Sequence, residues 1–252
     1  MIKEFIRKHL NKKGYDINKL GEHKQWPVDF EENHKKIIEK VRPYTMTSRE
    51  RIFGLIEAVN YLAKNQIAGD IVECGVWRGG SMLAIAEALM EVSDTSHELY
   101  LYDTFEGMSE PTEHDKDFAD KKAEELLLPN VNKDEDLIWA YSSLDAVKQT
   151  MSLTNYPQNK IHFVKGKVED TIPSTLPSNI CLLRLDTDWY ESTKHELLHL
   201  FPRLVKGGVL IIDDYGFWKG ARKAVDEYFA ENNIQILLNR LDDTGRIAVK
   251  LD

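Results

Sequence analysis

The sequence contains little cysteine and no long hydrophobic run, and both absences narrow the class of protein. Its 252 residues include two cysteines, Cys74 and Cys181. Each sits in an apolar stretch, so we expect buried thiols in a reducing compartment rather than disulfides or metal ligands. No run reaches the roughly 20 apolar residues that a membrane-spanning helix needs. Because residues 1–10 lack the apolar core of a signal peptide, we expect a cytoplasmic protein.

The chain also lacks the excess of positive charge that nucleic-acid binding requires. Lysine and arginine number 33 against 42 aspartates and glutamates, which gives a formal net charge of −9 at pH 7. Proteins bind a phosphate backbone through basic surfaces, so we expect no nucleic-acid partner. Residues 1–10 are basic and amphipathic, which suits a membrane surface, an oligomer contact or a loosely packed arm. We favour an oligomer contact or a loosely packed arm over a membrane surface, and we expect a homo-oligomer and no membrane partner.

Two widespread catalytic signatures are absent as well. The Gly-x-Gly-x-x-Gly fingerprint of dinucleotide-binding enzymes does not occur, and neither does the Gly-x-Ser-x-Gly elbow of Ser/His/Asp hydrolases. The histidines show no zinc spacing. His162, His195 and His199 fall in a predicted strand and a predicted helix, where surface or core positions explain them. Triad hydrolases and zinc enzymes are therefore disfavoured.

What the sequence does contain is a glycine-rich turn between a buried strand and a helix. Residues 70–74 form a short apolar run that ends in acid and cysteine, which predicts a buried strand. Gly75, Gly79 and Gly80 follow, and residues 81–92 show helical periodicity. Such a turn exposes backbone N–H groups to a ligand at the helix N-terminus. The same pattern also occurs as a plain structural turn in α/β proteins.

Strands and helices alternate along the rest of the chain. Ser48 is a plausible N-cap for a core-facing helix that runs to Asn65. The alternation predicts an α/β fold, with a mostly parallel sheet covered by helices on both faces and closed by an antiparallel C-terminal hairpin. Besides the strand at 70–74, the predicted strands are 98–105, 161–166, 180–185 and 209–212, with the hairpin formed by 234–239 and 247–251. Further helices are predicted at 120–127, 143–153, 194–204 and 219–231.

Three regions differ in character. The overall composition, 42% hydrophobic and 30% charged, is that of one globular domain with additions. Residues 1–43 are polar and lysine-rich, so we expect a helical extension outside the core fold, which occupies residues 44–252. Residues 107–140 are acidic and loop-like. A segment of this length inside a domain is usually a lid or substrate-binding insertion, or else disordered.

Acidic side chains follow the predicted strands at the edge where the carboxyl ends of parallel strands meet. Each has a plain explanation as a turn or capping residue. Together they concentrate negative charge, which costs stability unless a cation or a hydroxyl ligand offsets it. The set comprises Glu73, Asp103, Glu169, Asp186, Asp188, Asp213 and Asp214.

Two kinds of chemistry suit these acids. Asp103 ends the second strand, where a carboxylate can grip the two hydroxyls of a ribose. Asp186, Asp213 and Asp214 follow two neighbouring strands and offer oxygen ligands, which is the ligand type that Mg²⁺ prefers. The sequence therefore predicts a nucleoside-containing ligand and a magnesium ion at this edge of the sheet.

Six motifs in order give the chain a family resemblance. They are Tyr-Thr-Met-Thr-Ser at 44–48, Glu-Cys-Gly-Val-Trp-Arg-Gly-Gly at 73–80, Asp-Thr-Phe-Glu-Gly at 103–107, Gly-Lys-Val-Glu-Asp-Thr-Ile-Pro at 166–173, Arg-Leu-Asp-Thr-Asp-Trp-Tyr-Glu-Ser-Thr at 184–193 and Asp-Asp-Tyr-Gly at 213–216. From about Tyr44 to its end, the chain resembles the TylF/MycF family of macrocin and mycinamicin sugar O-methyltransferases. The resemblance implies a Rossmann-like class I methyltransferase fold with a seven-stranded sheet, and S-adenosylmethionine as cofactor.

The resemblance also implies roles for individual residues. Thr45 and Met46 would cover the methionine end of the cofactor, Asp103 would bind its ribose, and residues 167–169 would flank the adenine. Asp186, Asp213 and Asp214 would bind Mg²⁺, and Asp186 would also act as the general base. The implied cofactor-binding residues are Thr45, Met46, Glu73, Cys74, Gly75, Val76, Trp77, Asp103, Thr104, Phe105, Glu106, Gly107, Lys167, Val168 and Glu169.

The implied reaction moves a methyl group to a sugar hydroxyl. The acceptor would be a glycosylated natural product, a nucleotide sugar or a surface polysaccharide precursor. A metal-dependent methyltransferase acting on a catechol-like phenol has the same arrangement of acids and stays open. An NAD-dependent dehydrogenase is disfavoured by the missing fingerprint and by the terminal hairpin, and a non-catalytic cofactor-binding scaffold is the remaining alternative. Residues 107–140 form a longer insertion than we expect for the macrolide enzymes, so the acceptor and the hydroxyl methylated are left open.

Overall fold

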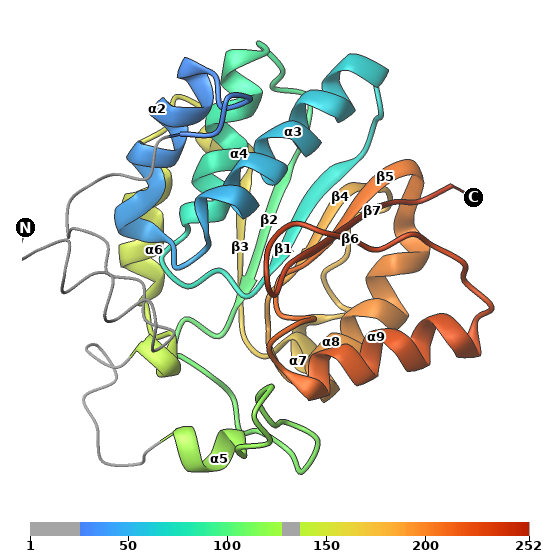
Figure 1. Cartoon of the computed structure of the whole chain (residues 1–252). Helices are drawn as coiled ribbons and strands as arrows, with labels where there is room; N and C mark the ends of the chain where they lie inside the picture. Colours follow the sequence, from blue (N-terminus) through green and yellow to red (C-terminus); the bar gives the residue numbers. More distant parts are fainter. Residues whose placement is uncertain (1–25, 128–136, 252) are drawn as a thin grey trace, which may run out of the picture. The chain divides into compact units, whose positions relative to one another are not determined.

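A single twisted sheet forms the centre of the main unit of the chain. The structure, a computed structural model, describes residues 26–127 and 137–251. It divides into a short N-terminal unit, residues 1–32, and a main unit from Asn33 onward. The seven strands of the main unit run in the order β3-β2-β1-β4-β5-β7-β6 (Figure 1). Their bounds are β1 Asp70–Cys74, β2 Leu99–Asp103, β3 Ile161–Lys165, β4 Ile180–Leu185, β5 Leu204–Ile212, β6 Asn239–Arg240 and β7 Arg246–Val249.

The pairing of the strands confirms the predicted topology. Strands β1 to β5 pair in parallel, β7 pairs antiparallel with β5, and β6 pairs antiparallel with β7. The chain order reverses between β1 and β4, because β2 and β3 lie on one side of β1 whereas β4 and β5 lie on the other. In open parallel sheets this switch point is where ligands bind, beyond the carboxyl ends of the strands.

Helices cover both faces of this sheet (Figure 1). On one face α3 packs on α4 and α4 packs on α6, and on the other face α8 packs on α7 and α9. This arrangement is the two-sided cover that the βα alternation predicts. The helices are α2 Glu32–Val41, α3 Arg49–Asn65, α4 Gly80–Glu91, α5 Ala123–Leu126, α6 Leu144–Met151, α7 Val168–Thr171, α8 Tyr190–Leu200 and α9 Lys219–Glu231. No helix within 26–127 or 137–251 combines the length and the apolar character needed to cross a membrane.

Local sequence explains where the two helices beside the switch point begin. The Ser48 side chain accepts a hydrogen bond from the backbone N–H of Arg51 at 3.1 Å, so it caps α3 as predicted. Helix α4 starts directly after Gly79, which has a φ of 83° and so occupies the left-handed region that glycine tolerates best. Most residues of α4 are buried because its apolar side chains extend around the whole helix.

The first strand of the predicted hairpin is shorter than expected. We predicted a strand over 234–239, but β6 spans only Asn239–Arg240. Ile234, Ile236 and Leu238 instead pack against the core beside α8 and α9. The alternation of apolar residues that suggested a strand thus reflects side chains facing the core. Only Asn239 and Arg240 pair with β7, opposite Ile247 and Arg246.

The described part of the 107–140 insertion is folded against the main unit. Asp115 is buried, and its Oδ1 accepts the backbone N–H of Tyr190 at the start of α8 at 2.8 Å. The Asp115 Oδ2 accepts the backbone N–H of Thr112 at 2.6 Å, which ties the insertion to itself. Ala123 and Trp218 belong to a small apolar cluster that joins the insertion to α9.

Part of two predicted regions lies outside the described residues. Of the predicted helical extension, residues 1–25 are not described, while Glu32–Val41 form α2 and Arg42–Tyr44 form a 3-10 turn. Residues 128–136 of the insertion are not described either. The predicted division into an extension, a core domain and a lid or substrate insertion therefore stays a prediction.

Candidate active site

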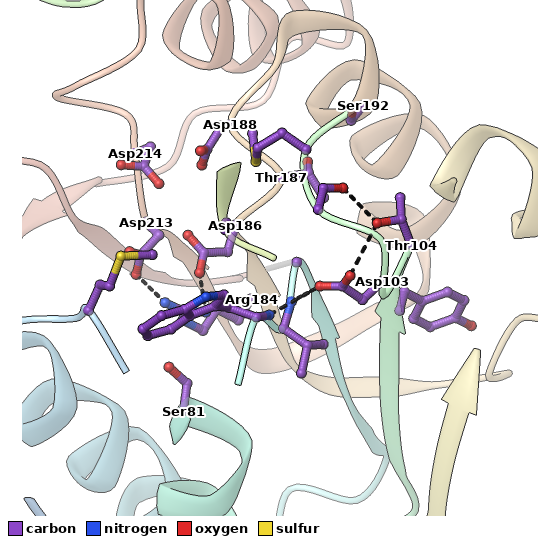
Figure 2. A pocket seen from close by; sticks show the side chains of 18 of the residues that line it. Ser81, Asp103, Thr104, Arg184, Asp186, Thr187, Asp188, Ser192, Asp213 and Asp214 are labelled. Atoms are coloured by element: carbon purple, nitrogen blue, oxygen red, sulfur yellow. Dashed lines mark hydrogen bonds and ion pairs between the residues drawn. The ribbon is translucent and has the colours of Figure 1, made fainter. Parts of the chain in front are cut away.

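A cavity of about 390 Å³ lies at the carboxyl ends of the parallel strands. Gly75 follows β1, Asp103 ends β2, Asp186 follows β4 and Asp213 follows β5, and all four line the cavity. Its position is therefore the one that the switch-point rule predicts. Figure 2 shows the side chains that surround this space, with Arg184 below the aspartates.

The glycine turn brings three segments of the chain close together. Gly75 has a φ of 81°, and a Cβ at this position would overlap the backbone of Asp186 after β4. A Cβ at Gly80 would overlap the backbone of Tyr44. The segment that contains Thr45 and Met46 therefore lies directly against the N-terminus of α4. Both residues line the cavity, as expected for a segment that covers a ligand.

Asp103 holds the glycine turn in place through backbone hydrogen bonds. Its Oδ2 accepts the N–H groups of Val76 at 2.7 Å and Trp77 at 3.1 Å, and its Oδ1 accepts that of Phe105 at 2.6 Å. Trp77 has a φ of 47°, which costs energy for a bulky residue and requires such support. Burial raises the pKa of Asp103, although these hydrogen bonds oppose the shift. The carboxylate predicted to bind a ribose thus also fixes the turn beside it.

The structure brings most of the predicted cofactor residues to the cavity, but not all of them. Those that line it are Thr45, Met46, Gly75, Val76, Trp77, Asp103, Thr104, Gly107, Lys167, Val168 and Glu169. Cys74 and Phe105 are buried away from the lining, and Glu106 forms an ion pair with Lys165 at 2.9 Å. Glu73 is also buried, where it pairs with Arg184.

Arg184 is a buried cation at the centre of the site. It interrupts the otherwise apolar strand β4 and is 2% exposed. Its Nη1 donates to Glu73 and, at 2.8 Å, to Oδ2 of Asp186, while its Nη2 donates to Oδ1 of Asp213. Burial raises the pKa of Glu73 to about 7, although the positive charge of Arg184 opposes this. Sequence reasoning missed this role, and the signal was a single arginine inside a buried strand.

Three aspartates form a cluster of carboxylates on one side of the cavity. Asp186, Asp188 and Asp214 each place one oxygen within 4.8 Å of the others, and Figure 2 shows them around a common space. Burial raises the pKa of Asp188 to about 7. It also raises the pKa values of Asp186 and Asp214, and neighbouring carboxylates add to both shifts. Clustered, partly buried oxygen donors of this kind fit a hard divalent cation such as Mg²⁺.

Asp213 and Asp188 differ from what the sequence suggested. Asp213 was expected among the metal ligands, yet its side chain is held by Arg184 and by Arg51 of α3. Asp188, for which the sequence indicated no role, takes the third place in the cluster beside Asp186 and Asp214. The difference arises because the direction of a side chain after a strand depends on its tertiary partners.

Part of the cavity lining is apolar, and the sequence did not single out the residues that form it. Met108 and Ile138 come from the insertion, and Phe217 and Trp218 come from the segment before α9. Trp218 contacts Trp189 edge to face, with ring centroids 4.9 Å apart. These residues carry no sequence signal of a site, since they read as ordinary core side chains.

Known proteins resemble this chain both in sequence and in fold. The Macrocin-O-methyltransferase (TylF) family matches residues 11–249, which begins well before the motif at Tyr44. A Streptomyces olivaceus protein, 8-demethyl-8-(2,3-dimethoxy-alpha-L-rhamnosyl)-tetracenomycin-C 4'-O-methyltransferase, is 33% identical over 80% of this chain and 74% of its own length. Mycinamicin III 3''-O-methyltransferase from Micromonospora griseorubida is 30% identical over 80% of this chain and 76% of its own length.

Solved structures show the same architecture. The O-methyltransferase NovP is 26% identical and superimposes with a TM-score of 0.71, covering 83% of each chain. The calicheamicin methyltransferase CalS11 is 14% identical with a TM-score of 0.58, covering 93% of this chain and 98% of its own, and this likeness concerns the fold alone. The cavity at the switch point, the ordered motifs and these matches agree: the chain belongs to the macrocin O-methyltransferase (TylF) family and is an S-adenosylmethionine-dependent O-methyltransferase with a Rossmann-like fold.

Proposed function

We propose that this enzyme methylates a sugar hydroxyl and that it depends on Mg²⁺. The acceptor would be a glycosylated natural product, a nucleotide sugar or a surface polysaccharide precursor. The observation that carries the proposal is that one cavity joins the glycine turn to the aspartate cluster of Asp186, Asp188 and Asp214. A methyl donor on the turn would therefore face an acceptor at the cluster. The named activities of the tetracenomycin and mycinamicin relatives support a sugar-containing acceptor.

The residues on the β1 and β2 side fit the cofactor. Gly80 and Ser81 at the N-terminus of α4 line the cavity, and a helix N-terminus favours a carboxylate such as that of the methionine moiety. Thr45 and Met46 would cover this end, Asp103 would bind the ribose, and residues 167–169 would flank the adenine. The side chain of Glu73 is not part of the cavity lining. It would therefore support the cofactor site indirectly, through its ion pair with Arg184.

The residues on the β4 and β5 side fit the metal. Asp186 and Asp214 would hold Mg²⁺, together with Asp188 in its present position or with Asp213 once that carboxylate is released by an arginine. When bound, the ion supplies Lewis-acid stabilisation of the negative charge that develops on the acceptor oxygen.

The proton of the acceptor hydroxyl would pass to an aspartate of the cluster. The sequence assigns this base to Asp186, whose Oδ2 accepts a hydrogen bond from Arg184. Asp188 is a second candidate, because its pKa is raised to about 7 and general bases work best near the operating pH. As the hydroxyl oxygen gives its proton to the carboxylate, it takes the methyl group and S-adenosylhomocysteine is left.

A product assay with purified full-length protein tests this function. The protein would be incubated with S-adenosylmethionine, Mg²⁺ and separate pools of nucleotide sugars, glycosylated natural products and catechols, and products would be sought at a mass gain of one methyl group. We expect methylated sugars, with turnover lost in EDTA and restored by Mg²⁺. Methylated catechols alone would favour the phenol alternative. S-adenosylhomocysteine binding without turnover on any pool would favour a non-catalytic scaffold.

Two further expectations concern the state of the protein in the cell. A homo-oligomer and a cytoplasmic location stay predictions from the sequence. Light scattering on the full chain and on a variant that begins at residue 44 would show whether the N-terminal extension contributes to an oligomer contact.

A further inference from the structure

Arg51 connects the aspartates of the site to the C-terminal hairpin. It lies in the first turn of α3, and its side chain is 14% exposed. Its Nη1 donates to Oδ2 of Asp213 and lies 3.3 Å from the carbonyl oxygen of the same residue. Its Nε lies 2.9 Å from Oδ2 of Asp242. One guanidinium group thus contacts two carboxylates, one directly after β5 and one in the turn between β6 and β7.

Asp242 is itself fixed, so Arg51 has little freedom to move. The Asp242 Oδ1 accepts the backbone N–H groups of Thr244 at 3.0 Å and Gly245 at 2.8 Å. Its Oδ2 accepts the hydroxyl of Ser48, the N-cap of α3, at 2.6 Å. The hairpin turn and the start of α3 therefore hold Arg51 in place from two sides.

This arrangement occupies both carboxylate oxygens of Asp213. Arg184 takes Oδ1 (Figure 2) and Arg51 takes Oδ2, so two arginines hold this carboxylate. Asp213 therefore stands outside the cluster of Asp186, Asp188 and Asp214. Breaking the contact between Arg184 and Asp213 would be costly, because the Arg184 guanidinium is buried and also pairs with Glu73. Arg51 lies nearer to solvent, and its contact with Asp213 is therefore the one that a cation can exchange.

We propose that Arg51 is a positioning residue that competes with a divalent cation for Asp213 and so limits the metal affinity of the site. The inference rests on the proposed magnesium site. Without the cation, Arg51 holds Asp213. With the cation, Oδ2 of Asp213 turns toward the cluster, while Arg51 keeps its ion pair with Asp242. Removing the guanidinium takes one positive charge away from the cavity and frees one carboxylate, and both changes favour a cation.

Binding of Mn²⁺, a paramagnetic substitute for Mg²⁺, tests this without relying on turnover. Free Mn²⁺ would be measured by electron paramagnetic resonance in titrations of the wild type, Arg51→Met and Arg51→Lys. We expect Arg51→Met to bind Mn²⁺ about tenfold more tightly, a change of about 1.4 kcal/mol. Arg51→Lys should return toward the wild-type affinity, because it restores the charge. Turnover of Arg51→Met should fall through kcat, with little change in KM for S-adenosylmethionine.

Two further variants keep the outcome interpretable. Asp242→Asn leaves the Arg51 charge but removes the carboxylate that holds Arg51 when Asp213 turns to the cation, so weaker Mn²⁺ binding is expected even where Arg51→Met does not fold. Arg49→Met changes an arginine of the same helix that pairs with Glu50 and should leave Mn²⁺ binding unchanged. Equal or weaker Mn²⁺ binding by Arg51→Met, or equal or tighter Mn²⁺ binding by Asp242→Asn if that is the folded variant, would overturn the inference. A wild type that binds no Mn²⁺ would instead refute the proposed metal site.

Discussion

The two ends of the sheet both carry buried polar side chains, but they differ in how well those groups are satisfied. At the amino end, His97 contacts the carbonyl oxygen of Gly69 at 2.5 Å and Asp94 at 3.2 Å. The thiol of Cys181 donates to Gly69, and Tyr156 donates to the backbone of His97. This amino-end cluster has the three residue types of a cysteine–histidine–acid triad, yet it is closed and fully bonded.

At the carboxyl end of the sheet, fewer of the buried polar side chains have all their hydrogen bonds. Among the described residues, buried side-chain atoms of Glu73, Thr187, Glu196 and Thr244 form no hydrogen bond of good geometry. The same holds for Nε of Arg51, although it lies 2.9 Å from Oδ2 of Asp242. Three of these residues line the cavity, and Glu73 and Glu196 lie next to lining residues. A buried polar group without a partner costs free energy, so its presence needs an explanation. The comparison teaches that residue types alone do not mark a site, whereas unsatisfied groups beside a cavity do.

The largest expected effect comes from removing the proposed base at the carboxyl end. Asp186→Asn should lower kcat by about 10²–10⁴-fold, because it removes the proposed proton acceptor and one proposed metal ligand. The affinity for S-adenosylhomocysteine, measured by calorimetry, should stay within about threefold, since most residues proposed to bind the cofactor lie on the β1 and β2 side. Asp188→Asn measured in parallel would identify which aspartate is the base. Wild-type turnover in both variants would contradict the assignment of the site.

Arg184→Met should have the largest effect on stability. It leaves Glu73, Asp186 and Asp213 without their shared cation, and breaking a buried ion pair costs about 3–5 kcal/mol. Urea unfolding would measure the loss. The matched control is Arg222→Met, which changes an exposed arginine of α9 that pairs with Asp226. It should change the free energy of unfolding by less than about 0.5 kcal/mol. A small loss of stability in Arg184→Met would mean that the carboxyl groups around Arg184 are already protonated in the wild type.

At the amino end, a substitution should change stability but not catalysis. His97→Ala removes the partner of Asp94 and of the Gly69 carbonyl, at a cost of about 1–3 kcal/mol. The kcat of the folded variant, measured well below its melting temperature, should equal that of the wild type. A fall in kcat would show that the amino-end cluster takes part in function, which would break the comparison.

The smallest effect concerns Glu196, which is fully buried on α8. Burial raises its pKa well above the ordinary value of 4.5, so the folded state holds the proton more tightly than the unfolded state. The stability that this proton contributes is complete below pH 4.5 and is lost as the pH rises toward the folded pKa. Glu196→Gln cannot ionise, so it should become the more stable form at high pH. Urea unfolding of the wild type and of Glu196→Gln from pH 4 to about 9 tests this. If the free energy of unfolding changes with pH in the same way for both proteins, the prediction is wrong.

Sequence reasoning located the cofactor side better than the catalytic side, and the reason is physical. Gly75 and Asp103 act through the backbone of nearby segments, so strand ends and glycine spacing suffice to place them. The orientation of Asp213 depends on Arg51, which is 162 residues away in the chain. The apolar wall around Trp218 depends on how the insertion packs. Contacts of this kind leave no periodic signal, and only the fold brings their members together.

The anchoring of the insertion bears on how the acceptor range of this enzyme can change. Asp115 fastens the insertion to the start of α8 through backbone N–H groups, and these bonds are independent of the neighbouring side chains. Met108 and Ser109 therefore reach the cavity from a fixed stem. We expect that exchanging residues beyond that stem would reshape the proposed acceptor site while the glycine turn and the aspartates keep their places. Loop grafting should then change the acceptor specificity without rebuilding the aspartate cluster.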